Sequence, residues 1–179
     1  MYKRQCIKYI LIASILNTCA FLSFAQSPTN YLTKANNDLT IANSLFEAGD
    51  FKAMPYYDSM ALQIGQTNKL PAIIGKAYYQ KGRYFLEMAN YKEAINNYNK
   101  ALAQFYEKNQ SNFTALIYND IGYTEGELGN YDDQINWYLK AIRVYETLDD
   151  DLGLAQVYSN LSTAYFDNGN DKLAFEYAE

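Results

Sequence analysis

The sequence predicts an all-α fold, a right-handed superhelix of stacked helix-turn-helix repeats. One observation is a spacing: Asp50-Phe51, Asn90-Tyr91, Asn130-Tyr131 and Asn170-Asp171 follow one another at intervals of forty residues. Another is that alanine at positions 61, 101 and 141 and tyrosine at positions 78, 118 and 158 keep the same interval. We call a set of residues spaced by forty a column. A fixed period of roughly 20–50 residues is typical of repeat proteins, in which each unit packs on its neighbours.

Each unit is predicted to hold two helices. In the second unit Gly75, Tyr78, Gly82 and Phe85 recur at steps of three and four, which places them on one face of a helix. The predicted helices cover residues 31–48, 51–66, 71–88, 91–108, 112–128, 131–148 and 151–168, and an eighth begins at 171. Pro55 indicates that the second of these helices starts a residue or two late, because proline does not fit inside a helix.

The breaks between the helices carry the residues of turns and caps. Within the pairs, the breaks are Gly49-Asp50, Ala89-Asn90, Gly129-Asn130 and Gly169-Asn170. Glycine closes a helix in the left-handed conformation, and Asp or Asn caps the helix that follows. Pro71, Ser111 and Asp151 form a column where the next pair begins, and they suit a first helical turn or an N-cap.

A column of small residues predicts close helix packing. It consists of Ala42, Gly82, Gly122 and Ser162 in the first helix of each unit. Small residues let two backbones approach, and the aromatic columns then fill the space beside them. The alternative for Gly82 and Gly122 is a kink. Glycine inside a helix costs about 1 kcal/mol relative to alanine, so its return in register favours the packing role.

The first 25 residues have the pattern of a secretory signal peptide. Lys3, Arg4 and Lys8 precede an apolar stretch, and Ser23-Phe24-Ala25 predicts cleavage between Ala25 and Gln26. The alternative is an uncleaved anchor, although the apolar run is short of the roughly 20 residues that span a bilayer. We therefore expect a signal peptide at 1–25, a short linker at 26–30 and a repeat array at 31–179. The expected location is the periplasm or the exterior.

The composition of the exported chain excludes several function classes. Both cysteines, Cys6 and Cys19, lie in the signal segment, and the sequence has no histidine. Thiol nucleophiles, histidine bases and ordinary zinc sites are therefore not expected, and neither is an enzyme, a metal site or a cofactor. Of the 15 basic residues three lie in the signal, which leaves 12 against 20 acidic residues, a net charge of −8. An acidic chain without a basic cluster is a poor partner for nucleic acid or anionic membranes.

Two acidic segments are candidates for calcium sites. Asp149-Asp150-Asp151 lies where two helices meet, and carboxylates at that place cap a helix. Asp167 to Asp171 resembles a calcium loop, but it falls on the turn column of the repeat and lacks the downstream glutamate. Both segments are therefore interpreted as turns.

The spacing of large and small residues within a unit resembles the tetratricopeptide repeat family. Matching residues in the second unit are Tyr78, Gly82, Phe85, Tyr91, Ala94, Tyr98 and Ala101. The resemblance covers about residues 31–179, in units of about 31–70, 71–110, 111–150 and an incomplete 151–179. The usual family period is 34, so the chain is similar to the longer variety in kinesin light chain and bacterial signalling proteins.

Some residues depart from the family pattern. Asp38 and Asp58 stand in aromatic columns, which predicts a polar N-terminal cap for the first unit. Glu125 stands in the column of Leu45, Phe85 and Tyr165. It is either a packing gap or a polar residue with a role of its own, and the gap is the favoured interpretation.

The resemblance implies a function and a site. The first helix of each pair is expected to line a concave groove that binds a protein or a peptide of unknown identity. The residues expected on that groove are Lys76, Tyr79, Gln80, Arg83, Asn119, Asp120, Tyr123, Ser159, Asn160 and Thr163. The alternative is an ordinary solvated helix face.

The phase of the repeat adds an expectation about the whole protein. The fourth unit stops inside its second helix, so the chain is expected to be the N-terminal part of a longer protein. The leading hypothesis is an exported interaction scaffold without enzymatic activity. The alternative is the periplasmic sensor region of a membrane-bound histidine kinase or transcriptional regulator, which rests on analogy.

Overall fold

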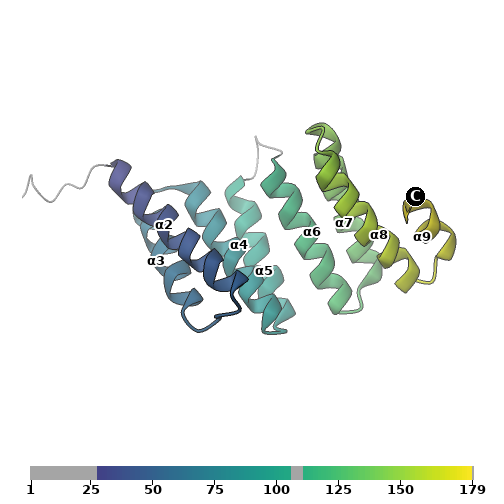
Figure 1. The fold of residues 1–179 in the computed structure, drawn as a ribbon, viewed down its shortest axis with the longest axis horizontal. Helices are drawn as coiled ribbons and strands as arrows, with labels where there is room; N and C mark the ends of the chain where they lie inside the picture. Colours follow the sequence, from purple (N-terminus) through teal and green to yellow (C-terminus); the bar gives the residue numbers. More distant parts are fainter. Residues whose placement is uncertain (1–27, 106–110, 179) are drawn as a thin grey trace, which may run out of the picture.

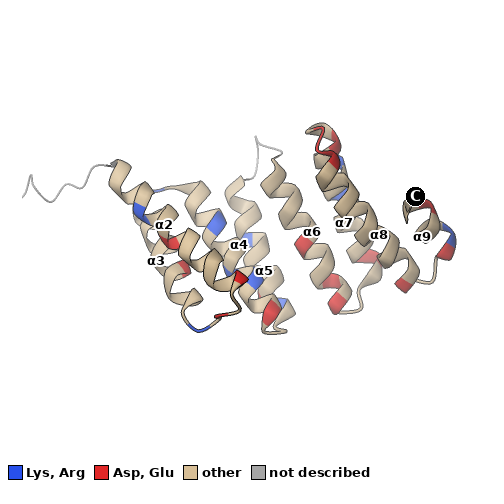
Figure 2. Cartoon of the chain, viewed as in Figure 1, with Lys and Arg blue, Asp and Glu red and all other residues tan. Residues whose placement is uncertain are grey.

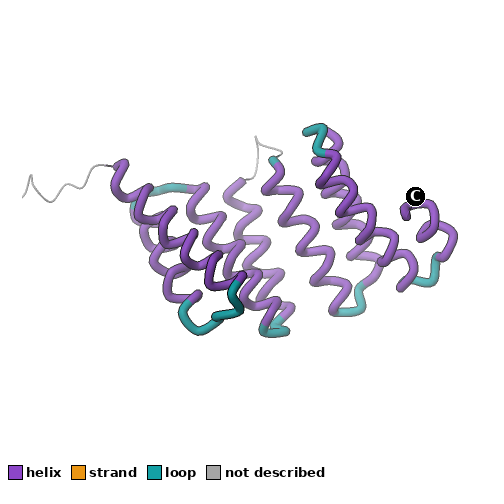
Figure 3. Tube along the Cα trace, in the orientation of Figure 1, coloured by secondary structure: helices purple, strands orange, loops and turns teal. Residues whose placement is uncertain are grey.

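A computed structural model describes residues 28–105 and 111–178 of the chain, and within these residues all regular structure is helical. In chain order the helices are α2 (Pro28–Glu47), α3 (Met54–Thr67), α4 (Pro71–Glu87), α5 (Tyr91–Phe105), α6 (Asn112–Glu127), α7 (Tyr131–Thr147), α8 (Asp151–Asp167) and α9 (Asp171–Ala178). Short turns connect α2 through α5 and α6 through α9, as the trace in Figure 3 shows.

The helices form consecutive pairs that stack into one extended array (Figure 1). The pairs are α2–α3, α4–α5, α6–α7 and α8–α9, and each second helix also packs against the first helix of the next pair. First helices contact one another as well, α2 with α4 and α6 with α8. The predicted all-α fold of stacked helix-turn-helix repeats is confirmed.

Three helix boundaries bear on the predictions. Residues 28–30, expected in the linker, belong to α2, whose described part starts at Pro28. Helix α3 begins at Met54, later than 51, with Pro55 in its first turn as predicted. The predicted signal peptide and its cleavage point, and residues 106–108 of the predicted fourth helix, lie outside the described residues.

The turns within the pairs share one left-handed geometry. Gly49, Gly129 and Gly169 have φ between 71° and 78°, and Ala89 in the same column has φ 53°. In each turn the amide N–H of this residue donates to the carbonyl three residues earlier, and the next N–H donates five residues back. This pattern is the Schellman motif, which satisfies the last carbonyls of a helix.

Replacing Ala89 by glycine is expected to stabilise the protein by about 0.5–1 kcal/mol. An alanine at positive φ is strained, whereas glycine adopts this conformation at little cost. Gly129→Ala is the matched reverse change, since a Cβ there meets no atom within 4 Å and only the backbone conformation suffers. Urea unfolding of the wild type and both variants measures these changes in the free energy of unfolding. A loss of stability in Ala89→Gly, or none in Gly129→Ala, would contradict it.

Glycine in the first helices makes room for an aromatic ring from the second. A Cβ at Gly82 would collide with the ring of Tyr98, and one at Gly122 would lie 2.8 Å from the ring of Tyr138. Both tyrosines are almost completely buried. The prediction that the small residues of the first helices allow close helix packing is confirmed. A kink at Gly82 or Gly122 is not needed to explain why glycine occurs there.

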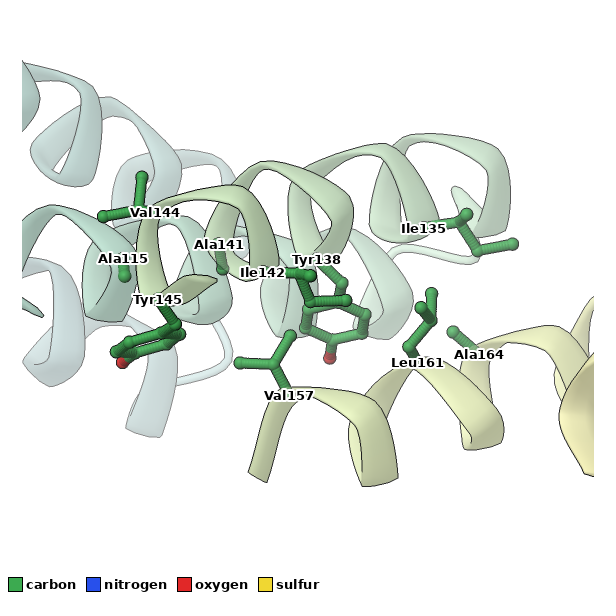
Figure 4. Packing of buried hydrophobic residues seen from close by; sticks show 10 residues of the cluster. All are labelled: Ala115, Ile135, Tyr138, Ala141, Ile142, Val144, Tyr145, Val157, Leu161 and Ala164. Atoms are coloured by element: carbon green, nitrogen blue, oxygen red, sulfur yellow. The ribbon is translucent and has the colours of Figure 1, made fainter. Parts of the chain in front are cut away.

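The apolar core runs along the whole array. In its C-terminal part, Tyr138 and Ala141 of α7 face Val157, Leu161 and other side chains of α8 (Figure 4). Similar clusters join α5 to α6 and α3 to the helices beside it. Each of α4, α6 and α8 therefore buries one side against its own pair and another against the pair before it.

The first unit departs from the predicted polar cap. Asp58 occupies the column of Tyr98 and Tyr138, yet its side chain is completely buried, and neither carboxylate oxygen has a hydrogen-bond partner. Burial raises the pKa of Asp58 to about 7, against the opposing attraction of Lys81 and Arg83. Asp58 therefore does not contribute to a polar cap, because α3 turns this position toward the interior.

The interpretation of Glu125 also changes. Its carboxylate accepts a hydrogen bond of 2.8 Å from the Nδ2 of Asn130, the residue that follows the turn glycine. Glu125 therefore ties the end of α6 to the turn rather than leaving a packing gap. The acidic segments lie in turns as interpreted, and Asp150 caps α8 by accepting from the N–H of Gly153 at 3.0 Å.

Candidate binding face

The ten residues predicted to bind a ligand lie on three of the first helices. Helix α4 carries Lys76, Tyr79, Gln80 and Arg83; α6 carries Asn119, Asp120 and Tyr123; α8 carries Ser159, Asn160 and Thr163. We call the surface formed by the first helices α2, α4, α6 and α8 the first-helix face. The structure divides the ten residues into two groups.

One group connects neighbouring first helices. Three hydrogen bonds each join residues 41 positions apart: the Nε2 of Gln80 to the carbonyl oxygen of Leu39 (2.9 Å), the hydroxyl of Tyr79 to the Oδ2 of Asp120 (2.9 Å), and the Nδ2 of Asn160 to the Oδ1 of Asn119 (2.8 Å). Tyr79, Gln80 and Asn119 are buried. These polar residues therefore hold one repeat to the next.

Burial raises the pKa values of Asp120 and Tyr79, which lie in the middle of this network. The pKa of Asp120 is raised by burial, against hydrogen bonds from Tyr79 and Asn119 that favour its charged form. Burial and the nearby Asp120 raise the pKa of Tyr79 well above its usual range. Tyr79 therefore keeps its proton and acts as a donor, so the pair serves as a tie between α4 and α6.

Arg83 connects α4 to α2 at the other end of the face. Its guanidinium donates to Asn43 at 2.8 Å and to Glu47 at 3.0 Å, and it lies 3.6 Å from the ring centre of Phe46. Planar stacking and a fork of donors are what arginine offers over lysine. The side chain of Arg83 is thereby held against α2.

The second group faces solvent. Lys76, Tyr123, Ser159 and Thr163 are exposed, and the Thr163 hydroxyl donates to the carbonyl of Ser159. Tyr123 is 48% exposed. Its pKa is raised, mainly by partial burial and to a smaller extent by the neighbouring Glu127. These four residues are the predicted ones whose side chains are open to a ligand.

A cavity of about 550 Å³ lies where α4, α6 and α8 begin and α7 ends. Its apolar walls come from Phe105, Phe113, Leu116, Tyr145 and Leu152. Lys76 is the one member of the predicted set that lines it, and Asp150 adds a carboxylate. Leu152 stands at the rim of this cavity and is 82% exposed.

Caps and a close approach position the rim of this cavity. Ser111 accepts from the N–H of Thr114 at 3.3 Å and caps α6, and Asp150, rather than the expected Asp151, caps α8. The Nδ2 of Asn112 donates to the Oδ2 of Asp150 at 2.7 Å, which joins the starts of α6 and α8. A Cβ at Gly153 would collide with the ring of Tyr145, so glycine allows this contact.

Sequence reasoning missed the cavity, although a signal was present. The column Ile73, Phe113, Gly153 replaces a large apolar residue by glycine at the start of α8.

A second missed column contains Glu47, Glu87, Glu127 and Asp167, which are exposed at the last turn of the first helices. Figure 2 shows acidic residues recurring at one end of these helices. The first-helix face thus has an apolar region and an acidic edge.

Within residues 28–105 and 111–178 no group of three or more acidic, cysteine or histidine residues is arranged to hold a metal ion. None of the described helices combines the length and the apolar character that crossing a membrane requires.

Comparisons with known proteins agree on the fold. Aspartyl phosphate phosphatase F from Bacillus subtilis superimposes with a TM-score of 0.77 at 21% identity, over 87% of this chain and 40% of that one. BtubC (BKLC) from P. vanneervenii gives 0.74 at 20% identity, over 84% and 62%. A STAND protein (Signal Transduction ATPase with Numerous Domains) with a tetratricopeptide repeat sensor from Pyrococcus horikoshii gives 0.73 at 18%, over 82% and 23%. This chain thus spans less than two thirds of each of these proteins.

No curated protein sequence is similar enough to be matched to this chain. Two family models, both described as Tetratricopeptide repeat, match residues 75–105 and 113–179. The matched segments cover most of α4, then α5, and α6 to α9. Within them Gly82 and Gly122 lie against tyrosine rings of the helix that follows. The repeat models, the paired helices and the similar solved structures together show that this chain belongs to the tetratricopeptide repeat family.

Proposed function

We propose that this chain is a scaffold that binds a protein segment on its first-helix face, with the cavity at the start of α4, α6 and α8 as the main contact. Tetratricopeptide repeats indicate a protein–protein interaction scaffold, and such folds are typically not catalytic. The observation that carries the proposal is the 550 Å³ cavity with aromatic walls and the exposed Leu152 at its rim. Concave apolar sites with a few polar groups are the usual binding sites of proteins.

The chemistry of the face suggests the kind of segment it binds. A large apolar side chain of the partner would fill the cavity between Phe113 and Tyr145, and Lys76 would pair with an acidic group beside it. Basic residues of the partner would lie toward the exposed Glu87 and Asp167. Tyr123, exposed on α6 between these regions, offers an amphipathic contact surface.

Site-specific photocrosslinking tests this proposal. A benzoylphenylalanine at Leu152 is expected to form an adduct with a partner in the producing cells. The same group at Tyr56, which is also exposed but lies on the second helix α3, is the matched control and should give none. Against a peptide from the captured partner, Leu152→Asp is expected to weaken the dissociation constant at least tenfold, about 1.4 kcal/mol.

Two results would contradict the proposal. One is the same adduct from both positions, which would indicate collision rather than a site. The other is an unchanged dissociation constant for Leu152→Asp with a native circular dichroism spectrum, which would place the binding surface outside the cavity.

We also propose that the chain is exported, because residues 1–25 have the basic, apolar and small-residue order of a signal peptide. Amino-terminal sequencing of the protein from cell fractions tests this, and a mature terminus at Gln26 is expected. A sensor role remains a second candidate function. It is supported by the similarity to a protein described as having a tetratricopeptide repeat sensor, and by the forty-residue period of the longer repeat variety.

A further inference from the structure

Three buried acceptor oxygens between α3 and α4 have no hydrogen-bond donor among the described residues. They are Oδ1 and Oδ2 of Asp58 on α3 and Oε1 of Gln80 on α4. Asp58 is completely buried, and Gln80 is only 8% exposed. A buried polar atom without a partner destabilises a fold, so its presence in a native structure needs a physical explanation.

Asp58 and Gln80 lie opposite one another on two antiparallel helices. Near the end of α3, a Cβ at Gly65 would lie 3.1 Å from the Cγ2 of Ile73 near the start of α4, so these two positions face each other. Asp58 comes two turns before Gly65, and Gln80 comes two turns after Ile73. The faces that meet at Gly65 and Ile73 therefore meet again at Asp58 and Gln80.

The next unit supports this register. Its residues at the equivalent positions are Tyr98 on α5 and Asp120 on α6, which are 22 positions apart, as Asp58 and Gln80 are. Burial, and after it the charge of Asp120, raises the pKa of Tyr98. Side chains at these two positions are therefore close enough to interact.

A hydrogen bond to α2 fixes the orientation of the Gln80 amide. Its Nε2 donates to the carbonyl oxygen of Leu39 at 2.9 Å. Exchanging the oxygen and nitrogen of the amide would set two acceptors against each other, so Oε1 is the atom left for α3. An ionised Asp58 offers only acceptors, whereas a protonated one has an O–H donor. A proton on Asp58 therefore supplies the donor that Oε1 lacks.

We propose that a proton held by Asp58 ties the first helix pair, α2 and α3, to the rest of the array, and that the tie is lost when the proton leaves. The carboxyl O–H of Asp58 donates to Oε1 of Gln80, and Nε2 of Gln80 donates to Leu39, so one glutamine joins α3, α4 and α2. An ionised Asp58 would set its charge against Oε1. The first pair then opens more readily, because each unit of a repeat protein contacts only its neighbours.

Burial and the nearby charges set the pH range of this tie. Burial raises the pKa of Asp58 from 3.8 to about 7, and Lys81 and Arg83 on α4 oppose this rise. The acids of α2, Asp38 and Glu47, are not among the groups that shift it, and Glu47 is paired with Arg83. The opened pair releases the proton near pH 4 and the closed pair near pH 7. The stabilisation is therefore complete below about pH 4 and is lost as the pH rises to about 7.

Hydrogen exchange of the whole chain, followed by mass spectrometry of its peptides, tests this proposal. The protection factors of amides in α2 and α3 are expected to fall about tenfold per pH unit between about pH 5 and 7, and to level off above that range. Protection factors are already corrected for the pH dependence of exchange in an unfolded chain. Those of α6 and α7 should change much less, because opening of the first pair leaves these helices packed.

Two variants separate the proton from its acceptor. Asp58→Asn has an amide donor at every pH, so the fall in α2 and α3 should disappear. Gln80→Leu removes Oε1, so Asp58 holds its proton less tightly and protection should level off about one pH unit lower. Asp167→Asn, at an exposed position in the last turn of α8, is the control and should behave like the wild type.

Any of three results would overturn the proposal. One is the same pH dependence in α6 and α7 as in α2 and α3, which would indicate unfolding of the whole array. The second is a fall that persists in Asp58→Asn, and the third is an unchanged levelling-off pH in Gln80→Leu. Circular dichroism shows whether the variants are folded, and Asp58→Asn tests the role of the proton without Gln80→Leu.

Discussion

Gly82→Val is expected to lower the free energy of unfolding by about 2–3 kcal/mol, because its side chain would occupy the place of the Tyr98 ring. Intrinsic helix propensity works in the opposite direction, since valine is better than glycine in a helix interior. A loss of stability must therefore come from the helix contact. Urea unfolding of both proteins measures it.

A double-mutant cycle with Tyr98→Ala makes this result specific. Removing the ring opens the space that the introduced valine side chain needs, so the double variant should be more stable than the sum of the single losses implies. Simple additivity would mean that Gly82 and Tyr98 are not coupled and would reject the packing role of this column. An unchanged stability of Gly82→Val alone would reject it as well.

Asp58→Asn is expected to remove a pH dependence of stability. Burial raises the pKa of Asp58 from 3.8 in the unfolded chain to about 7 in the fold. Between these values the folded state holds a proton that the unfolded state has released, so stability falls by about 1.4 kcal/mol per pH unit as the pH rises. The total loss above pH 7 is on the order of 4 kcal/mol.

The measurement is the difference in unfolding free energy between variant and wild type from about pH 5.5 to 7.5, within the range where the two states differ in bound protons. Asp58→Asn should gain about 2 kcal/mol on the wild type over this range, because the variant has no carboxyl group to ionise. Asp167→Asn, at an exposed position in the last turn of α8, is the control and should run parallel to the wild type. Parallel curves for Asp58→Asn would show that the carboxyl group reaches solvent.

The first unit differs from the next two at both the small column and the position of Asp58. Where the first helix has Gly82 or Gly122, the second helix supplies a tyrosine ring that fills the space. The first unit has Ala42 at this place, and it is completely buried. The side chain at position 58 is also short, so the first unit has a buried aspartate where the next two units have a tyrosine ring.

The candidate site was predictable only in part. The polar columns on the first helices are recognisable in the sequence, but their roles depend on what the next helix places opposite them. Asn160 and Asp120 bond neighbouring repeats, whereas Tyr123 and Lys76, on the same faces, remain exposed. Periodicity assigns a residue to a face of its own helix and gives no distance to another helix.

The sequence by itself determined the helix pairs, their turns and their packing scheme. These follow from local rules: a period of 3.6 residues, glycine and asparagine at helix ends, and small residues against rings. The tertiary structure decided which polar residues are buried and where the cavity lies. Asp58 and Leu152 show the reason. Burial depends on the side chains that other helices bring to the same point, and the position of a residue in the repeat does not specify those side chains.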